Sequence, residues 1–83
     1  MSKKEKLIVR FMAKPNDFTW NELVNLLSYF DFEEVAKGKT AGSRRAFVHS
    51  ETKQIIRLHK PHPGNVLKQY QLKEIHDILN LDD

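Results

Sequence analysis

Three of the four histidines in this chain, His49, His59 and His62, lie in one stretch, residues 38–64. The stretch includes a basic loop that follows a glycine, with the sequence GSRR at residues 42–45. Histidine can take up and release a proton near neutral pH, and arginine is suited to holding phosphate groups. If the protein binds a polyanion or carries out chemistry on one, we expect this stretch to do so.

Positive charge is unevenly distributed along the chain. The formal net charge is only +3, yet nine Lys or Arg residues and a single acid, Glu51, lie within residues 37–73. A one-sided basic segment of this kind favours phosphate backbones or an acidic protein partner over an ordinary solvated surface. Nucleic acid is therefore the first partner that the charge pattern predicts.

Composition limits both the chemistry and the location of the protein. With 83 residues, the chain is expected to form one small domain. It has no cysteine, which excludes disulfides and thiolate ligands, and the pair His59 and His62 is a weak basis for zinc. We therefore predict no metal and no cofactor. No apolar run reaches the roughly 18 residues of a membrane span, so we expect a cytoplasmic protein without membrane contact.

Apolar periodicity predicts three helices. The first, over residues 3–13, is expected to end before Pro15, because the residue that precedes a proline is kept out of the helical region. The second, over residues 20–29, follows a T-x-x-E capping box that begins at Thr19. The third covers residues 68–80 and has one apolar face.

Three strands are predicted between the second and third helices. Residues 32–36 form a short first strand, and residues 44–49 alternate as a second strand does. In the third strand, over residues 53–59, Arg57 and His59 share a face. Short connections make these strands an antiparallel meander. With both flanking helices on one face and the other face open, the predicted fold class is α+β.

Several prominent side chains have a structural interpretation. Trp20 and Phe47 are expected in or beside the core, because they recur with the apolar periodicity of a helix and a strand. His49 is predicted to flank a turn, and His76 to be structural or solvated. Tyr70 could either face RNA or pack against the sheet.

The features that occur in order over residues 20–79 are a capped helix, the basic glycine loop, the strand residue Phe47, a β-branched strand, a turn at His62 and a final helix. In this order they resemble the HicA-type mRNA interferase toxins. The resemblance implies a fold like a double-stranded-RNA-binding domain, α-β-β-β-α with a three-stranded antiparallel sheet. We divide the chain accordingly into an N-terminal helical extension, residues 1–15, and a single domain of this type, residues 16–83.

The same resemblance implies a function. The protein would be the toxin of a type II toxin–antitoxin system and an endoribonuclease that cleaves mRNA without a metal ion. Its partners would be mRNA and a HicB-like antitoxin.

One position departs from the family pattern. The catalytic histidine of the family usually lies two residues after the loop glycine, and counting from Gly42 this position is Arg44. Arginine stays protonated at neutral pH, so Arg44 cannot act as a general base. It can hold a phosphate or stabilise an anionic transition state. The role of the family's catalytic residue therefore does not transfer to this position.

Metal-free RNA cleavage needs a base for the attacking ribose 2′-hydroxyl, an acid for the leaving oxygen and cations near the phosphate. We predict His62 and His59 as candidates for proton transfer, with Arg44 at the phosphate. The turn at His62 is stiffened by prolines on both sides, which suits a side chain that must be aimed. The residues predicted to bind RNA are Lys39, Ser43, Arg44, Arg45, Arg57, Lys60 and Lys68.

Two other functions fit the same residues. The domain could bind RNA without cleaving it, with the chemistry lost at Arg44, and would then show salt-dependent binding but no cleavage. Alternatively, the basic surface could mainly dock an acidic protein, with no direct role for RNA. The sequence leaves open the RNA sequence preference and the oligomeric state.

Overall fold

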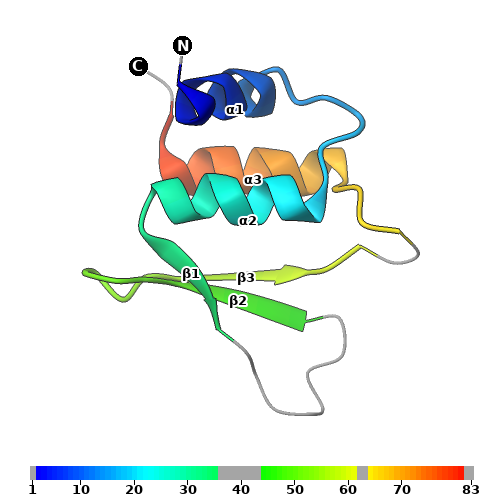
Figure 1. Ribbon diagram of the computed structural model, residues 1–83. Coiled ribbons are helices and arrows are strands. Elements are labelled where there is room, and N and C mark those ends of the chain that lie inside the picture. The colour runs from blue at the N-terminus through cyan, green and yellow to red at the C-terminus, as the bar shows by residue number, and fades with distance from the viewer. Residues whose placement is uncertain (1, 36–43, 62–63, 82–83) are drawn as a thin grey trace.

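The computed structural model describes residues 2–35, 44–61 and 64–81, and Figure 1 shows its elements. The helices are α1 (Lys3–Met12), α2 (Trp20–Tyr29) and α3 (Gln69–Leu79), and the strands are β1 (Phe32–Val35), β2 (Arg44–His49) and β3 (Ile55–His59). The strands pair in the order β1-β2-β3, both pairs antiparallel. The predicted α+β fold with a three-stranded meander is confirmed.

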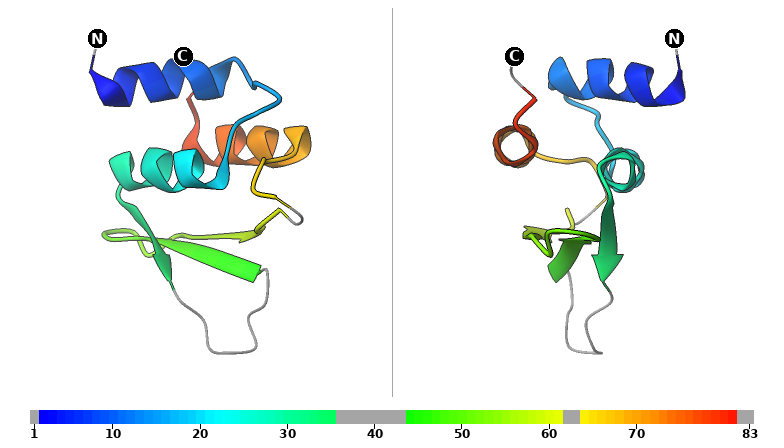
Figure 2. Two further views of the ribbon diagram at one scale, coloured as in Figure 1. Left: turned by 45° about the vertical axis from the view of Figure 1, so that its right-hand side comes forward. Right: turned by 90° about the vertical axis from the view of Figure 1, so that its left-hand side faces the viewer.

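The helices lie together on one side of the sheet. In Figures 1 and 2, α2 and α3 run side by side over one sheet face, and α1 lies across them on the side away from the sheet. The opposite sheet face is not covered by any helix of the described chain (Figure 2). Within the described ranges, none of the helices combines the length and apolar character that crossing a membrane requires.

Local sequence signals set the ends of the first two helices. Ser2 and Glu5 form a capping box before α1, and Thr19 and Glu22 form the predicted one before α2. α1 ends at Met12. Lys14 then adopts a φ of +49°, outside the right-handed helical region, as its place before proline led us to expect.

The third strand is shorter than its sequence pattern predicts. It begins at Ile55, two residues later than residue 53, because Lys53 has a φ of +64° and belongs to the turn between β2 and β3. The amide of His49 donates to the carbonyl of Gln54 at 2.9 Å and closes that turn. Lys53 and Gln54 continue the alternating pattern in sequence but not in backbone conformation.

The core lies between the sheet and the helices and extends to α1. Trp20 and Phe47 are buried there as predicted, with ring centroids 5.6 Å apart. Phe11 of α1 is also fully buried and meets Phe18 edge-on at 5.5 Å. Aromatic burial of this kind is among the largest contributions a single side chain makes to stability. The N-terminal helix is therefore packed into the same core as α2 and α3.

A short antiparallel bridge joins the segments that precede α2 and α3. The amide of Trp20 donates to the carbonyl of Asn65 at 2.7 Å, and the amide of Leu67 donates to the carbonyl of Phe18 at 2.8 Å. The chain that leaves the sheet after β3 is thereby brought back beside the start of α2. The bridge therefore fixes the position of the start of α3 relative to the end of β3.

Candidate nucleic-acid interface

The sheet face that α2 and α3 leave uncovered is termed the open face. Strand alternation and the register of the strand pairs place on it Glu33, Val35, Ala46, Val48, Ile55, Arg57 and His59. Ile56 and Leu58, which alternate with these residues in β3, are buried under the helices. The prediction that Arg57 and His59 share a face is confirmed.

Two basic side chains, Arg57 and His59, lie on the open face. In the register of β2 and β3, Arg44 lies opposite His59, and Ala46 lies opposite Arg57. The side chains of Arg57 and His59 are exposed. Directly opposed residues of an antiparallel pair lie about 5 Å apart, so the backbone of Arg44 lies close to that of His59. Ile55, 47% exposed, continues this surface as an apolar patch.

Arg45 lies on the other face of the sheet. Its register partner is the buried Leu58, and its half-buried guanidinium forms an ion pair with Glu34 at 3.2 Å. Adjacent residues of a strand point to opposite faces, so Arg45 does not share a surface with Arg57.

Two further predicted RNA-binding residues, Lys60 and Lys68, lie where β3 ends and α3 begins. The side chain of Gln71, almost fully buried, spans this place. Its Nε2 donates to the carbonyl of His59 at 2.9 Å, and its Oε1 accepts from the amide of Lys68 at 3.0 Å. The backbone of Lys68 is thus held near the end of β3.

Gln71 had no role in the sequence analysis. The only local signal is its place three residues after the cap of α3, where glutamine commonly completes a capping box. Of the other predicted site residues, Lys39, Ser43 and His62 lie outside the described residues.

The remaining two histidines have structural positions. His49 Nδ1 accepts hydrogen bonds from the amides of Glu51 and Thr52, both at 3.1 Å, and so holds the turn after β2. His76 is buried in α3, and its Nδ1 lies 2.6 Å from the Lys14 ammonium. An ammonium has only donors, so Nδ1 is the acceptor in that contact. Both interpretations made from the sequence are confirmed.

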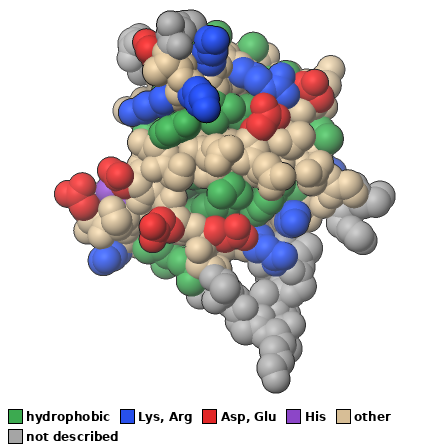
Figure 3. Space-filling model, in the orientation of Figure 1, with side chains coloured by type: hydrophobic (Ala, Val, Ile, Leu, Met, Phe, Trp, Pro, Cys, Tyr) green, Lys and Arg blue, Asp and Glu red, His purple; other side chains and the backbone are tan. Residues whose placement is uncertain are grey.

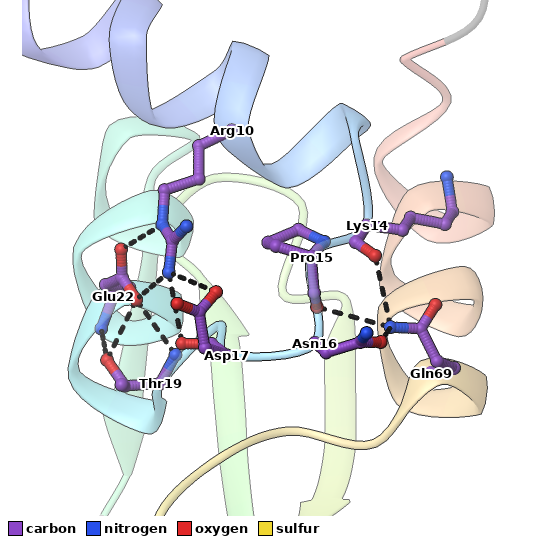
Figure 4. Close-up of polar contacts among 8 residues, drawn as sticks. All are labelled: Arg10, Lys14, Pro15, Asn16, Asp17, Thr19, Glu22 and Gln69. Carbon is purple, nitrogen blue, oxygen red and sulfur yellow. Dashed lines mark hydrogen bonds and ion pairs between the residues drawn. The ribbon is translucent and has the colours of Figure 1, made fainter.

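A network of charged groups joins α1 to the start of α2, on the helix side of the molecule (Figure 4). Arg10 Nε donates to Glu22 at 2.6 Å, and Arg10 also bonds the side chain and carbonyl of Asp17. The hydrogen bond from Arg10, with smaller contributions from Thr19, lowers the pKa of Glu22 from its ordinary 4.5 to about 2. Glu22 in turn raises the pKa of Arg10 above its usual range. This network supports the fold and lies away from the open face.

Positive charge is not restricted to the sheet. Lys3, Lys4 and Lys6 are exposed on α1, and Figure 3 shows Lys and Arg side chains both over α1 and around the sheet. What distinguishes the open face is therefore an exposed imidazole, His59, on the same face as an exposed arginine, Arg57, rather than charge alone. Among residues 2–35, 44–61 and 64–81, no three His, Asp or Glu side chains are grouped so that they could hold a metal ion.

Comparison with known proteins gives one match. A family model described as the HicA toxin of bacterial toxin–antitoxin matches residues 20–81, from the first residue of α2 to just beyond α3. Comparisons with curated proteins and with solved structures gave no match. The match covers well over half of the chain and leaves α1 outside it.

Proposed function

The chain belongs to the HicA family of toxins from bacterial toxin–antitoxin systems, and from this we propose that it binds mRNA and cleaves it by a metal-free ribonuclease mechanism. As the toxin of such a pair, it has an antitoxin as its protein partner. We expect it to act in the cytoplasm, where its substrate is. The observation that carries the proposal is that Arg57 and His59 are exposed on the open face, with Arg44 paired to His59 in the register of β2 and β3.

In the proposed reaction, a neutral imidazole takes the proton of the ribose 2′-hydroxyl as its oxygen attacks the adjacent phosphorus. A second group gives a proton to the departing 5′-oxygen, and the product carries a 2′,3′-cyclic phosphate. We assign His59 and His62 to these proton transfers, because both are histidines and His62 follows His59 by only three residues in the sequence. Arg44 and Arg57 stabilise the negative charge that grows on the phosphate.

The arginine at position 44 favours a second function. The usual catalytic base is absent there, so the domain could retain RNA binding on the open face and lack cleavage. The two functions differ in one measurable respect, since only the first yields cyclic-phosphate products.

A HicB-like antitoxin is proposed to cover the open face. That face carries Arg57, His59 and the exposed Ile55, so an acidic partner segment with apolar anchors would fit it. Such a partner would compete directly with RNA. An antitoxin that neutralises the toxin while leaving RNA binding intact would contradict this placement.

The experiment is cleavage of a structured mRNA in the presence of a chelator. His59→Asn and His62→Asn are each expected to lower the rate by about 100-fold or more, the usual contribution of a general acid or base. RNA affinity should change little, because the cations remain. Lys73→Ala, an exposed basic residue of α3 on the helix side, is the control and should cleave like the unaltered protein. Undiminished cleavage by both histidine variants would refute the assignment.

Arg44→His separates the two functions. If the unaltered protein binds RNA without cleaving it and Arg44→His gains cleavage, the protein is an RNA-binding module. If the unaltered protein cleaves RNA to cyclic-phosphate products, the ribonuclease function stands.

A further inference from the structure

Gln71 is a buried polar residue that uses both ends of its amide. It is 4% exposed, its Nε2 donates to the carbonyl of His59, and its Oε1 accepts from the amide of Lys68. A buried amide that loses such partners leaves polar groups unsatisfied, which is costly. Both partners are backbone groups, one at the end of β3 and the other just before α3. A single side chain therefore fixes both ends of the connection between them.

The hydrogen bond to His59 lies at the end of an edge strand, where the sheet opens most readily. β3 is an edge strand that pairs only with β2, and His59 with Arg44 is the last pair of the ladder. Strand ends open more readily than strand centres. The amide of Gln71 holds the His59 peptide from the helix side, while the imidazole lies on the open face. The peptide plane in turn sets the direction in which the His59 side chain leaves the backbone.

We propose that Gln71 is a positioning residue for His59: it holds the last peptide of β3 so that the imidazole faces the scissile phosphate. The inference rests on the proton-transfer role proposed for His59. Gln71 does not touch the substrate and acts only through the backbone. It therefore affects the rate of the chemical step rather than the affinity for RNA.

A second glutamine in the same turn of α3 offers a control. Gln69 Nε2 donates to the carbonyls of Lys14 and Pro15 and to the side chain of Asn16, at 3.1 to 3.2 Å (Figure 4). It thus holds the connection between α1 and α2, as Gln71 holds the end of β3. Loss of Gln69 removes side-chain hydrogen bonds from the same helix turn without altering the His59 peptide, although Gln69 is exposed and Gln71 is buried.

Gln71→Glu separates positioning from helix capping. An ionised glutamate still accepts from the Lys68 amide but cannot donate to the His59 carbonyl. Once protonated, it can do both. If the donated bond matters, activity relative to the unaltered protein at the same pH should rise as the solution is acidified. If only the cap matters, that ratio should stay near one at every pH.

The experiment measures kcat and KM for RNA cleavage, with thermal unfolding, for Gln71→Met, Gln71→Glu and Gln69→Met. Gln71→Met is expected to lower kcat about tenfold with KM nearly unchanged, since a displacement near 1 Å can cost up to about 100-fold. Gln69→Met should leave kcat within about twofold. An unchanged kcat in folded Gln71→Met, or an equal loss in Gln69→Met, would overturn the proposal.

The NMR signals of the His59 ring provide a readout that is independent of catalysis. They should stay single in Gln69→Met and become broadened or doubled in Gln71→Met. If the unaltered protein does not cleave RNA, the ribonuclease proposal fails, and this spectrum decides whether Gln71 orients His59. An undisturbed His59 signal in Gln71→Met would then overturn the inference by itself.

Discussion

The helix side and the open face of this protein differ in what their polar side chains do. On the helix side, Arg10, Glu22 and Gln69 reach across to other segments and bind them by hydrogen bonds. On the open face, Arg57 and His59 point to solvent from the middle and the end of a strand. The fold is thus secured from the side opposite Arg57 and His59.

This separation explains why the open face can change without loss of the fold. The exposed side chains of Arg57 and His59 take no part in the buried core. A substitution on the open face alters the groups offered to a ligand and leaves the core intact. We expect substitutions on the two sides to affect different measurements.

The largest effect on stability is expected at α1, outside the family match. Phe11→Ala removes a fully buried ring and should lower the free energy of unfolding by about 3–5 kcal/mol. Urea unfolding followed by circular dichroism measures this. Val9→Ala on the same helix is the control, because Val9 is 55% exposed and its change should stay within about 0.5 kcal/mol. Similar values for the two variants would mean that α1 is not part of the core.

The next effect concerns the pH dependence of stability. The pKa of Glu22 is lowered to about 2, chiefly by the hydrogen bond from Arg10, so its contribution is complete above about 4.5. That contribution is lost as the pH falls from about 4.5 to 2, because the unfolded chain binds the proton first. The stability of Glu22→Gln should therefore fall less than that of the unaltered protein as the pH is lowered through this window. Thermal unfolding at several pH values measures this. Identical pH profiles would show that the network contributes nothing.

A smaller effect is expected at the cap of α2. Thr19→Ala removes the side-chain oxygen that accepts from the Glu22 amide and should cost about 1 kcal/mol. Thr19→Ser keeps that oxygen and should recover most of the loss. Failure of serine to recover stability would point to the methyl group of Thr19 rather than the cap.

The smallest effect on stability is expected on the open face. Arg57→Ala should change the free energy of unfolding by no more than about 0.5 kcal/mol, because the side chain is exposed. The same variant should reduce the salt dependence of RNA binding by about 0.7–0.9 in the log–log slope, the value of one phosphate contact. A large loss of stability, or an unchanged slope, would remove the distinction between the two sides.

Most of the fold could be predicted because local sequence patterns determine its helices and strands. α2 and β2 begin and end where the capping box and the strand alternation predict. β3 was predicted too long, since alternation continues through Lys53 although its backbone turns there. The alternation of side chains along a strand also predicted that Arg57 and His59 share one face. The same alternation in β2 puts Arg45 on the opposite face.

The side-chain links between distant segments could not be predicted. Gln71 binds a carbonyl 12 residues away, and Gln69 binds one 55 residues away. Such pairs leave no periodic signal, because they depend on how packed elements meet. The ion pair between Arg10 and Glu22 was not predicted for the same reason, although the capping box to which Glu22 belongs was predicted.

The bridge between the segments preceding α2 and α3 has a consequence for the kinetics of opening. The amides of Trp20 and Leu67 are bonded across segments almost fifty residues apart in sequence, outside the sheet and outside both helical ladders. Fraying of a helix end or a strand edge does not release them. Their exchange with deuterium should therefore follow the slowest, global opening of the domain. These two amides would report on the unfolding of the whole protein, even when RNA or an antitoxin occupies the open face.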